Sequence, residues 1–227
     1  MKNLKVLTIL SLLFYITTIF GQLQREIQHP DIAGRLFKNS GREATKPLGL
    51  PYLQIVFKDA KVTKINTTAP MRYNVYGDEF EFINPKNDTL VLDKIEEFSD
   101  LTFIATNTKY KLVNYTLENG KLNYGYLIDL YQKNDFGLFK KQTILLSEEK
   151  IAKTSMERSM PPQYSKIGDK YYLKSKNNIS EFPDSKKRLS KIFPDKKELI
   201  EIFVKENKIN FDKDADKIKI IDFLSNL

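Results

Sequence analysis

The side chains that most often carry catalysis at neutral pH are scarce in this sequence. The 227 residues include one histidine and no cysteine, whereas acid–base and nucleophilic catalysis usually recruit His, Cys or two carboxylates with separated pKa values. The single histidine, His29, lies beside Pro30 in a polar stretch, where we expect it to be solvated. One imidazole and no thiolate cannot make a zinc site of clustered His and Cys ligands. We therefore assign no catalytic, metal-binding or cofactor-binding residue and expect no cofactor.

Carboxylates are the remaining route to catalysis. Asp78, Glu79 and Glu81 lie close together, and the pairs Glu96–Glu97 and Glu148–Glu149 follow later. A glycosidase needs two carboxyl groups facing each other across a cleft, and adjacency in sequence does not supply that arrangement. In a strand, Glu79 and Glu81 point the same way and could help to bind calcium, but a solvated edge face is the favoured interpretation. A carbohydrate-active or other hydrolase using Asp/Glu pairs is the second functional hypothesis.

One aromatic and basic segment is the best candidate for a ligand-binding or partner-binding surface. Tyr164, Lys170, Tyr171 and Tyr172 follow the proline pair Pro161–Pro162. Tyrosine next to a basic residue can stack on sugars or bind anionic ligands. The favoured alternative is a proline-bounded linker that leads into one more strand whose tyrosines fill the core.

Two short motifs indicate a structural pair and a modification site. In the alternating segment around Arg72, we expect the guanidinium to pair with Asp78 or Glu79 across a hairpin. The tripeptide Asp88–Leu90 resembles the Asp-Ser/Thr-apolar acceptor for O-glycosylation of exported Bacteroidetes proteins, which makes Thr89 the expected acceptor.

The N-terminal segment has the order of a Sec-type signal peptide. The basic residues Lys2 and Lys5 precede the apolar run Val6–Ile16, which is shorter than the ~20 residues of a membrane span. We expect cleavage after Gly21, the small residue at position −1. The alternative is an uncleaved anchor, because the bulky Ile19 departs from the usual pattern at −3. No later stretch is long and apolar enough to be expected to span a bilayer as a helix.

Composition agrees with an exported bacterial domain. With no cysteine, the chain has neither disulfides nor the lipid-bearing residue of a lipoprotein. Removal of Lys2 and Lys5 leaves 35 Lys+Arg against 29 Asp+Glu, a net charge of +6. These charges are interspersed, so a solvated basic surface is the favoured interpretation, and export disfavours nucleic acid as a partner. The expected location is the periplasm, the outer membrane surface or the medium.

Ten short strand-like runs predict an antiparallel meander. The dipeptide Asn119–Gly120 favours a type I′ turn, and Gly77–Asp78 connects a second hairpin. Along Glu79–Phe82, alternation places both phenylalanines on a buried face and both glutamates in solvent. The strand Leu122–Tyr131 is apolar on both faces and is expected to be central. The expected strands are Tyr52–Phe57, Lys61–Ile65, Met71–Tyr76, Glu79–Ile83, Thr89–Leu92, Leu101–Ala105, Tyr110–Leu117, Leu122–Tyr131, Gly137–Leu146 and Tyr171–Lys174.

The C-terminal stretch changes to a helical period. We expect helices over Asp184–Phe193, Asp195–Glu206 and Lys213–Ser225, with Asp184 capping the first and Asp212 the third. Their inward-facing residues are expected to be Leu189, Ile192 and Phe193, then Leu199, Ile202 and Phe203, then Ile218, Ile221 and Leu224. These apolar stripes must pack on each other or on a sheet face.

The elements together predict an α+β fold that is predominantly antiparallel β, as a meander, sandwich or curled sheet, with C-terminal helices. The expected organisation is a signal peptide at 1–21, a polar leader at 22–46, a β-rich domain at 47–182 and a helical segment at 183–227 that packs on it.

Four segments together resemble an uncharacterised family of short exported proteins of Bacteroidetes. They are Gly49–Leu53, Pro70–Phe82, Gly168–Leu173 and Phe203–Phe211. The resemblance covers most of the mature chain and implies a bacterial envelope or secreted location. The resemblance implies no active site. Export together with the scarcity of catalytic residues predicts a non-enzymatic binding or structural protein, with an envelope protein or a polysaccharide as its expected partner. A third hypothesis is an accessory subunit of an outer-membrane complex.

Overall fold

The computed structural model describes residues 45–154 and 156–227. The predicted signal peptide, its cleavage site, His29 and most of the predicted leader lie outside the described residues. The unit Lys46–Leu227 is compact. Within the described residues, none of the helices is long and apolar enough to cross a membrane.

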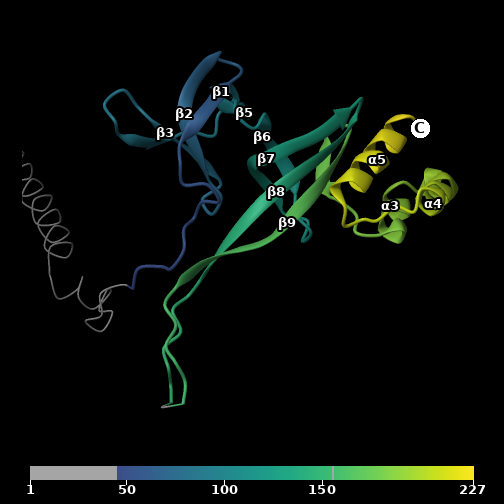
Figure 1. The fold of residues 1–227 in the computed structure, drawn as a ribbon. Helices are drawn as coiled ribbons and strands as arrows, with labels where there is room; N and C mark the ends of the chain where they lie inside the picture. The colour runs from purple at the N-terminus through teal and green to yellow at the C-terminus, as the bar shows by residue number, and fades with distance from the viewer. Residues whose placement is uncertain (1–44, 155) are drawn as a thin grey trace, which may run out of the picture. The chain divides into compact units, whose positions relative to one another are not determined.

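This unit combines a ten-stranded sheet with three α-helices and two short 3-10 turns, so the predicted α+β class with C-terminal helices is confirmed (Figure 1). The strands are β1 (Lys58–Val62), β2 (Thr67–Asn74), β3 (Glu79–Ile83), β4 (Thr89–Val91), β5 (Asp100–Phe103), β6 (Thr108–Thr116), β7 (Leu122–Lys133), β8 (Phe136–Ser147), β9 (Gln163–Ser175) and β10 (Asn178–Glu181). The 3-10 turns are η1 (Glu96–Phe98) and η2 (Pro194–Lys196), and the helices are α3 (Lys186–Ile192), α4 (Lys197–Glu206) and α5 (Asp214–Ser225).

The sheet is a meander that folds back on itself. Its strand order is β10-β9-β8-β7-β6-β5-β1-β2-β3-β4, and β10 also pairs with β6 through a parallel bridge between Ser180 and Thr116. Strands β6 to β10 therefore close a ring, whereas β1 to β5 continue the sheet on the other side of β6. Of the alternatives that the sequence allows, the curled sheet is the one observed.

Strand alternation sends neighbouring side chains into different cores. In β7, Tyr126 and Ile128 belong to the first core, shared with β1, β2, β3 and β5, whereas Leu127 lies in the small core of the ring with Tyr115 and Phe139. Both faces of β7 are buried, because successive residues of a strand point to opposite faces. The predicted central position of this strand is confirmed.

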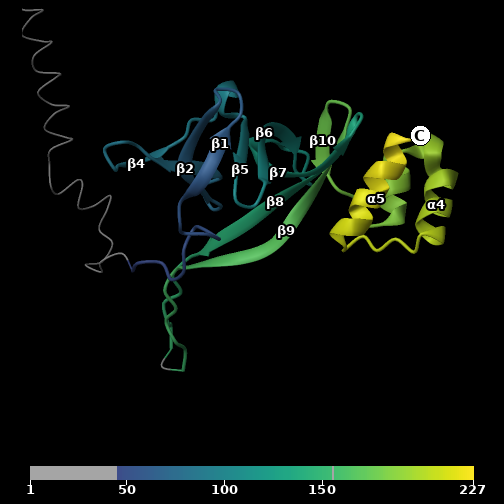
Figure 2. The same cartoon turned by 45° about the horizontal axis from the view of Figure 1, so that its top comes forward.

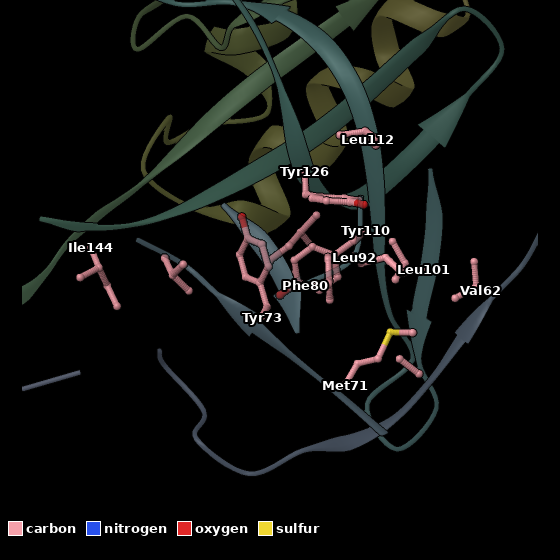
Figure 3. Close-up of a cluster of buried hydrophobic side chains, with 13 residues drawn as sticks. Val62, Met71, Tyr73, Phe80, Leu92, Leu101, Tyr110, Leu112, Tyr126 and Ile144 are labelled. Carbon is pink, nitrogen blue, oxygen red and sulfur yellow. The ribbon is translucent and has the colours of Figure 1, made fainter. Parts of the chain in front are cut away.

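The first core is mainly aromatic. Phe80 is fully buried and meets Tyr110 and Tyr126 edge to face, with ring centres 5.1 and 4.8 Å apart. Tyr73 packs against the same ring (Figure 3). Phe82 is partly buried against this core, so the predicted inward face of β3 is confirmed. Such ring pairs contribute about 0.5–1.5 kcal/mol each beyond their buried area.

Both predicted hairpins form, but the Asn119–Gly120 turn is not type I′. Gly120 has a φ of +78°, whereas Asn119 has a negative φ. The N–H of Gly120 donates to the carbonyl of Leu117, and the N–H of Leu117 donates to the carbonyl of Lys121. This pattern is a longer loop in which one glycine in the left-handed region completes the turn.

Several strand predictions were wrong in extent, and β10 was not predicted. Strand β1 covers Lys58–Val62 instead of Lys61–Ile65, and β2 covers Thr67–Asn74 instead of Met71–Tyr76. Residues 52–57 make only one bridge, between Tyr52 and Asn74, because this segment crosses the sheet instead of joining it. Strand β9 begins at Gln163 rather than Tyr171, since β8 is long enough to pair with it from Ser147 onward. The end of the β8–β9 hairpin projects away from the rest of the sheet (Figure 1).

The helices pack against the ring of strands, with α5 lying on β7 and β8 (Figure 2). Their common core joins Leu189, Ile200 and Ile220 to Leu138 and Leu173 of the sheet. The predicted caps were wrong, because Ser185 caps α3 and Lys213 precedes α5. The predicted inward position of Ile192 in α3 was wrong, because Ile192 is 44% exposed, and the inward stripe of α4 was also misplaced. Its most buried residue is Ile200, with the partly buried Phe203 and Val204 completing the stripe, while Leu199 and Ile202 are about half exposed.

Burial of tyrosine hydroxyls predicts that the domain unfolds in alkali. Burial raises the pKa of Tyr73, Tyr110, Tyr126 and Tyr172 above the ordinary 10.0. A group whose pKa is raised on folding contributes its full stability below its unfolded pKa and loses it as the pH rises through the folded value. Stability should therefore fall above about pH 10, with phenolate absorbance and loss of far-ultraviolet circular dichroism appearing together. Ionisation of every tyrosine near pH 10 with an unchanged dichroism spectrum would contradict this.

Candidate functional site

The turn between β2 and β3 carries a partly buried carboxylate, Asp78, with a φ of +54°. Its Oδ1 accepts hydrogen bonds from the hydroxyl of Tyr73 at 2.6 Å, from the backbone N–H of Tyr126 at 3.2 Å and from the ammonium of Lys141. Its Oδ2 accepts from Lys94 Nζ at 2.9 Å. We name these residues the Asp78 cluster. The Asp78 cluster links the β2–β3 turn to Tyr126 of β7 and Lys141 of β8, two strands that are not neighbours of β2 or β3 in the sheet.

Every polar atom at the centre of the Asp78 cluster is satisfied. Besides its bond to Asp78, Lys141 Nζ donates to the hydroxyl of Tyr73 at 2.9 Å and to the carbonyl of Tyr126 at 3.0 Å. Burial lowers the pKa of Lys141, and the charge of Asp78 opposes that shift. The hydrogen-bonding capacity of the Asp78 carboxylate and the Lys141 ammonium is therefore used within the protein and is not available to a ligand. We interpret the cluster as structural.

Arg72 pairs with Glu81, not with Asp78 or Glu79 as predicted. In the hairpin register Arg72 lies directly opposite Glu81, and its Nε donates to Glu81 Oε2 at 2.7 Å. Glu79 lies opposite Asn74 and accepts from its amide at 3.2 Å. The predicted solvent position of Glu81 was also wrong, because Glu81 is only 7% exposed.

The crossing segment 52–57 is responsible for that burial. The Tyr52 hydroxyl donates to Glu81 Oε1 at 2.8 Å and accepts from Arg72 Nη2 at 3.0 Å. The guanidinium of Arg72 lies over the rings of Tyr52 and Phe57, 4.1 and 4.5 Å from their centres. Arg72 therefore holds the crossing segment against β2 and β3.

A groove of about 300 Å³ opens beside this segment, next to the first core. Its apolar lining includes Tyr73, Tyr110 and Ile128 from three strands, and Leu53 and Val56 of the crossing segment form part of its wall. This volume is at the lower end of the range for small-molecule sites, which are mostly apolar with a few polar groups.

The charged side chains that line the groove are all basic. They are Lys58, Arg72 and Lys140, and the lining includes no Asp or Glu. Arg72 is neutralised by Glu81, and Lys140 Nζ lies 3.8 Å from Asp169 Oδ2. Within the described part of the chain, Lys58 makes neither an ion pair nor a side-chain hydrogen bond. The groove therefore presents an uncompensated positive charge beside an apolar floor.

The predicted aromatic and basic surface is divided among three places. Tyr164 packs on the first core and on Tyr76, and Tyr172 is buried inside the ring of strands. Tyr171 and Lys170 line a second cavity beside the helices. The tyrosines thus mostly fill cores along one long strand, as the favoured alternative predicted.

The other predicted residues lie apart from the groove. Thr89 is exposed on β4, a position open to an O-glycosylating enzyme. Glu96 pairs with Lys64 on the surface, and Glu97 and Glu148 are exposed. Across the residues that the structure describes, none of the acidic groups forms a cluster that could hold a metal ion. The groove residues come from six strands and three connecting segments, so no local sequence motif predicts them.

Comparison with known proteins identifies no relative, since no protein-family model, curated protein or solved structure matches the chain.

Proposed function

We propose that this chain is an exported, non-enzymatic binding protein of the bacterial envelope whose groove takes an anionic ligand with an apolar body. The observation that carries the proposal is the lining of the groove, where three basic side chains and no carboxylate surround an apolar floor. An anionic group satisfies Lys58, and the rest of the ligand replaces water against Tyr110 and Ile128. The signal-like N-terminus supports export to the periplasm, the outer membrane surface or the medium.

Binding is favoured over hydrolysis because the two carboxylates that bond to groove residues Tyr73 and Arg72 are already engaged. Asp78 is held by two lysines and a tyrosine, and Glu81 is held by Arg72 and Tyr52. A glycosidase needs one carboxyl group that gives up a proton and a second that acts on the opposite face of the sugar. Among the residues that the structure describes, no carboxylate lines the groove to play either part.

Binding of an aromatic sulfonate tests the proposal. We expect 8-anilinonaphthalene-1-sulfonate to bind the folded domain saturably with enhanced fluorescence. Lys58→Gln should weaken this binding about three- to ten-fold, which corresponds to about 0.7–1.4 kcal/mol for one exposed charge contact. Thr108→Phe, which places a ring in the groove, should abolish binding while the domain remains folded.

Two controls test separately the location of the binding site and the role of its positive charge. Lys186→Gln removes an exposed lysine of α3 and should leave binding unchanged. The neutral compound N-phenyl-1-naphthylamine has a similar apolar body and should bind more weakly than the sulfonate. If the sulfonate does not bind, or if Thr108→Phe does not affect its binding, the groove is not the site. Equal binding of the neutral compound would refute the role of charge.

A further inference from the structure

The groove beside the crossing segment is long and follows the sheet from strand to strand. Apart from β2 and the connecting segments, its lining comes from β8, β7, β6, β5 and β1, which are consecutive in the sheet order. Neighbouring strands lie about 4.8 Å apart, so the path from β8 to β1 measures up to about 19 Å along the curled sheet. A ligand that fills the groove is therefore elongated.

The strand register makes the floor of the groove continuous. Lys140 of β8 lies opposite Ile128 of β7, and Ile128 lies opposite Tyr110 of β6. The rings of Tyr110 and Phe103 meet edge to face, with their centres 5.9 Å apart. Phe103 lies opposite the β1 residue that is two positions after Lys58, so Lys58 points to the same face of the sheet. Ile128, Tyr110 and Phe103 thus lie between the two lysines.

The two ends of the groove differ in charge. At the β8 end, Lys140 Nζ lies 3.8 Å from Asp169 Oδ2 and 4.0 Å from Asp214 Oδ2, so this ammonium is already compensated. At the β1 end, Lys58 has no ion-pair partner among the described residues. An anionic group is therefore attracted more strongly to the β1 end.

A pair of hydroxyl groups lines the groove near the β1 end. Thr108 lies opposite Phe103, and the Oγ1 atoms of Thr108 and Thr106 are 2.7 Å apart and share one hydrogen bond. That bond uses one of the two hydroxyl protons, so the other can be donated to a carboxylate. The β1 end can thus offer an ammonium and a hydroxyl donor to one anionic group.

The crossing segment supplies an aliphatic wall. Leu53 and Val56 line the groove, with exposed fractions of 37% and 70%. On the floor, Phe103 and Leu130 are only partly buried against the first core. These side chains leave apolar surface in contact with water, and an alkyl chain that covers it is favoured by the hydrophobic effect.

We propose that the groove binds a straight-chain fatty acid of medium length, with its carboxylate at Lys58 and its alkyl chain running over Phe103 and Leu130 toward β8. This inference rests on the function proposed above and adds the shape, the charge and the orientation of the ligand. A dianion is disfavoured, because its second charge must lie on the apolar floor or beside the compensated Lys140.

Calorimetric titration of the full mature chain with hexanoate, octanoate and decanoate, below the concentrations at which they form micelles, tests the shape of the ligand. Each added pair of methylene groups should strengthen binding about four-fold, as expected for methylenes that are partly buried in an open groove. Decanedioate has the same number of carbon atoms as decanoate and a second carboxylate. It should bind at least about ten-fold more weakly than decanoate.

Two substitutions test the orientation. Lys58→Gln should weaken all three monocarboxylates by the same factor, about three- to ten-fold. Gln142→Leu adds apolar surface at the β8 end of the groove, so it should strengthen decanoate binding about three-fold. Hexanoate binding should stay unchanged in this variant, because the shorter chain does not reach β8. The matched control Gln163→Leu changes an exposed glutamine outside the groove lining and should leave every affinity unchanged.

Four results would each overturn this inference. They are no binding of decanoate, equal affinities for hexanoate and decanoate, equal affinities for decanoate and decanedioate, and an equal effect of Gln142→Leu on the short and the long chain. Such results leave the proposed function intact if 8-anilinonaphthalene-1-sulfonate still binds and its binding depends on Lys58. If the sulfonate does not bind either, both proposals are refuted.

Discussion

Gly125→Ala is expected to destabilise the domain by about 1–3 kcal/mol, the cost of leaving buried polar groups without hydrogen-bond partners. A Cβ added at Gly125 would lie 2.1 Å from Asp78 Oδ2 and 3.2 Å from its Cγ. Real carbon atoms do not approach an oxygen that closely, so the carboxylate must move away from β7. Because Lys141 and Tyr73 are buried around it, that movement leaves polar groups without partners.

Urea unfolding followed by circular dichroism measures this effect. The matched control is Gly168→Ala in β9, where a Cβ would meet no atom within 4 Å and the backbone is outside the left-handed region. We expect that control to change stability by less than about 0.5 kcal/mol, as most surface substitutions do. Equal urea midpoints for Gly125→Ala and Gly168→Ala would show that Asp78 does not lie against β7.

Asp78→Asn should also destabilise the domain by about 3–5 kcal/mol, because it leaves Lys141 buried without its counter-charge. Lys141→Met should cost less, since Asp78 keeps its bonds to Lys94, to the Tyr73 hydroxyl and to the N–H of Tyr126. The double variant should be more stable than the sum of the single effects predicts, because the second substitution removes the group that the first one isolates.

A double-mutant cycle in urea gives the coupling between Asp78 and Lys141. The comparison pair is Arg188 with Asp184, an exposed pair at the start of α3. Its coupling should be much smaller, because solvent screens exposed charges. Additive effects of the Asp78 and Lys141 substitutions would mean that the two side chains do not interact.

The β2–β3 hairpin shows which structural features the sequence predicts and which it does not. Alternation along Glu79–Phe82 correctly predicts that Phe80 is buried and that a hairpin turns at Gly77–Asp78. It does not predict the partner of Arg72, since the loop length sets the register. Once the structure shows that Asn74 faces Glu79, Arg72 must face Glu81. The burial of Glu81 depends on Tyr52, which reaches it from outside the hairpin.

The groove could not be predicted because its residues meet only after the sheet has curled. Lys58 and Lys140 lie 82 positions apart and line one groove.

The pairing of β10 with β6 has a consequence for aggregation. Open sheet edges recruit strands from other molecules and can start fibrils. Here β10 also bridges to β6, so β4 is the remaining terminal strand of the sheet across the residues described. It offers only three exposed residues, Thr89–Val91, and the acidic residues Asp88 and Asp93 lie on either side of them. A ten-stranded sheet with so short and charged an edge resists polymerisation through its strands.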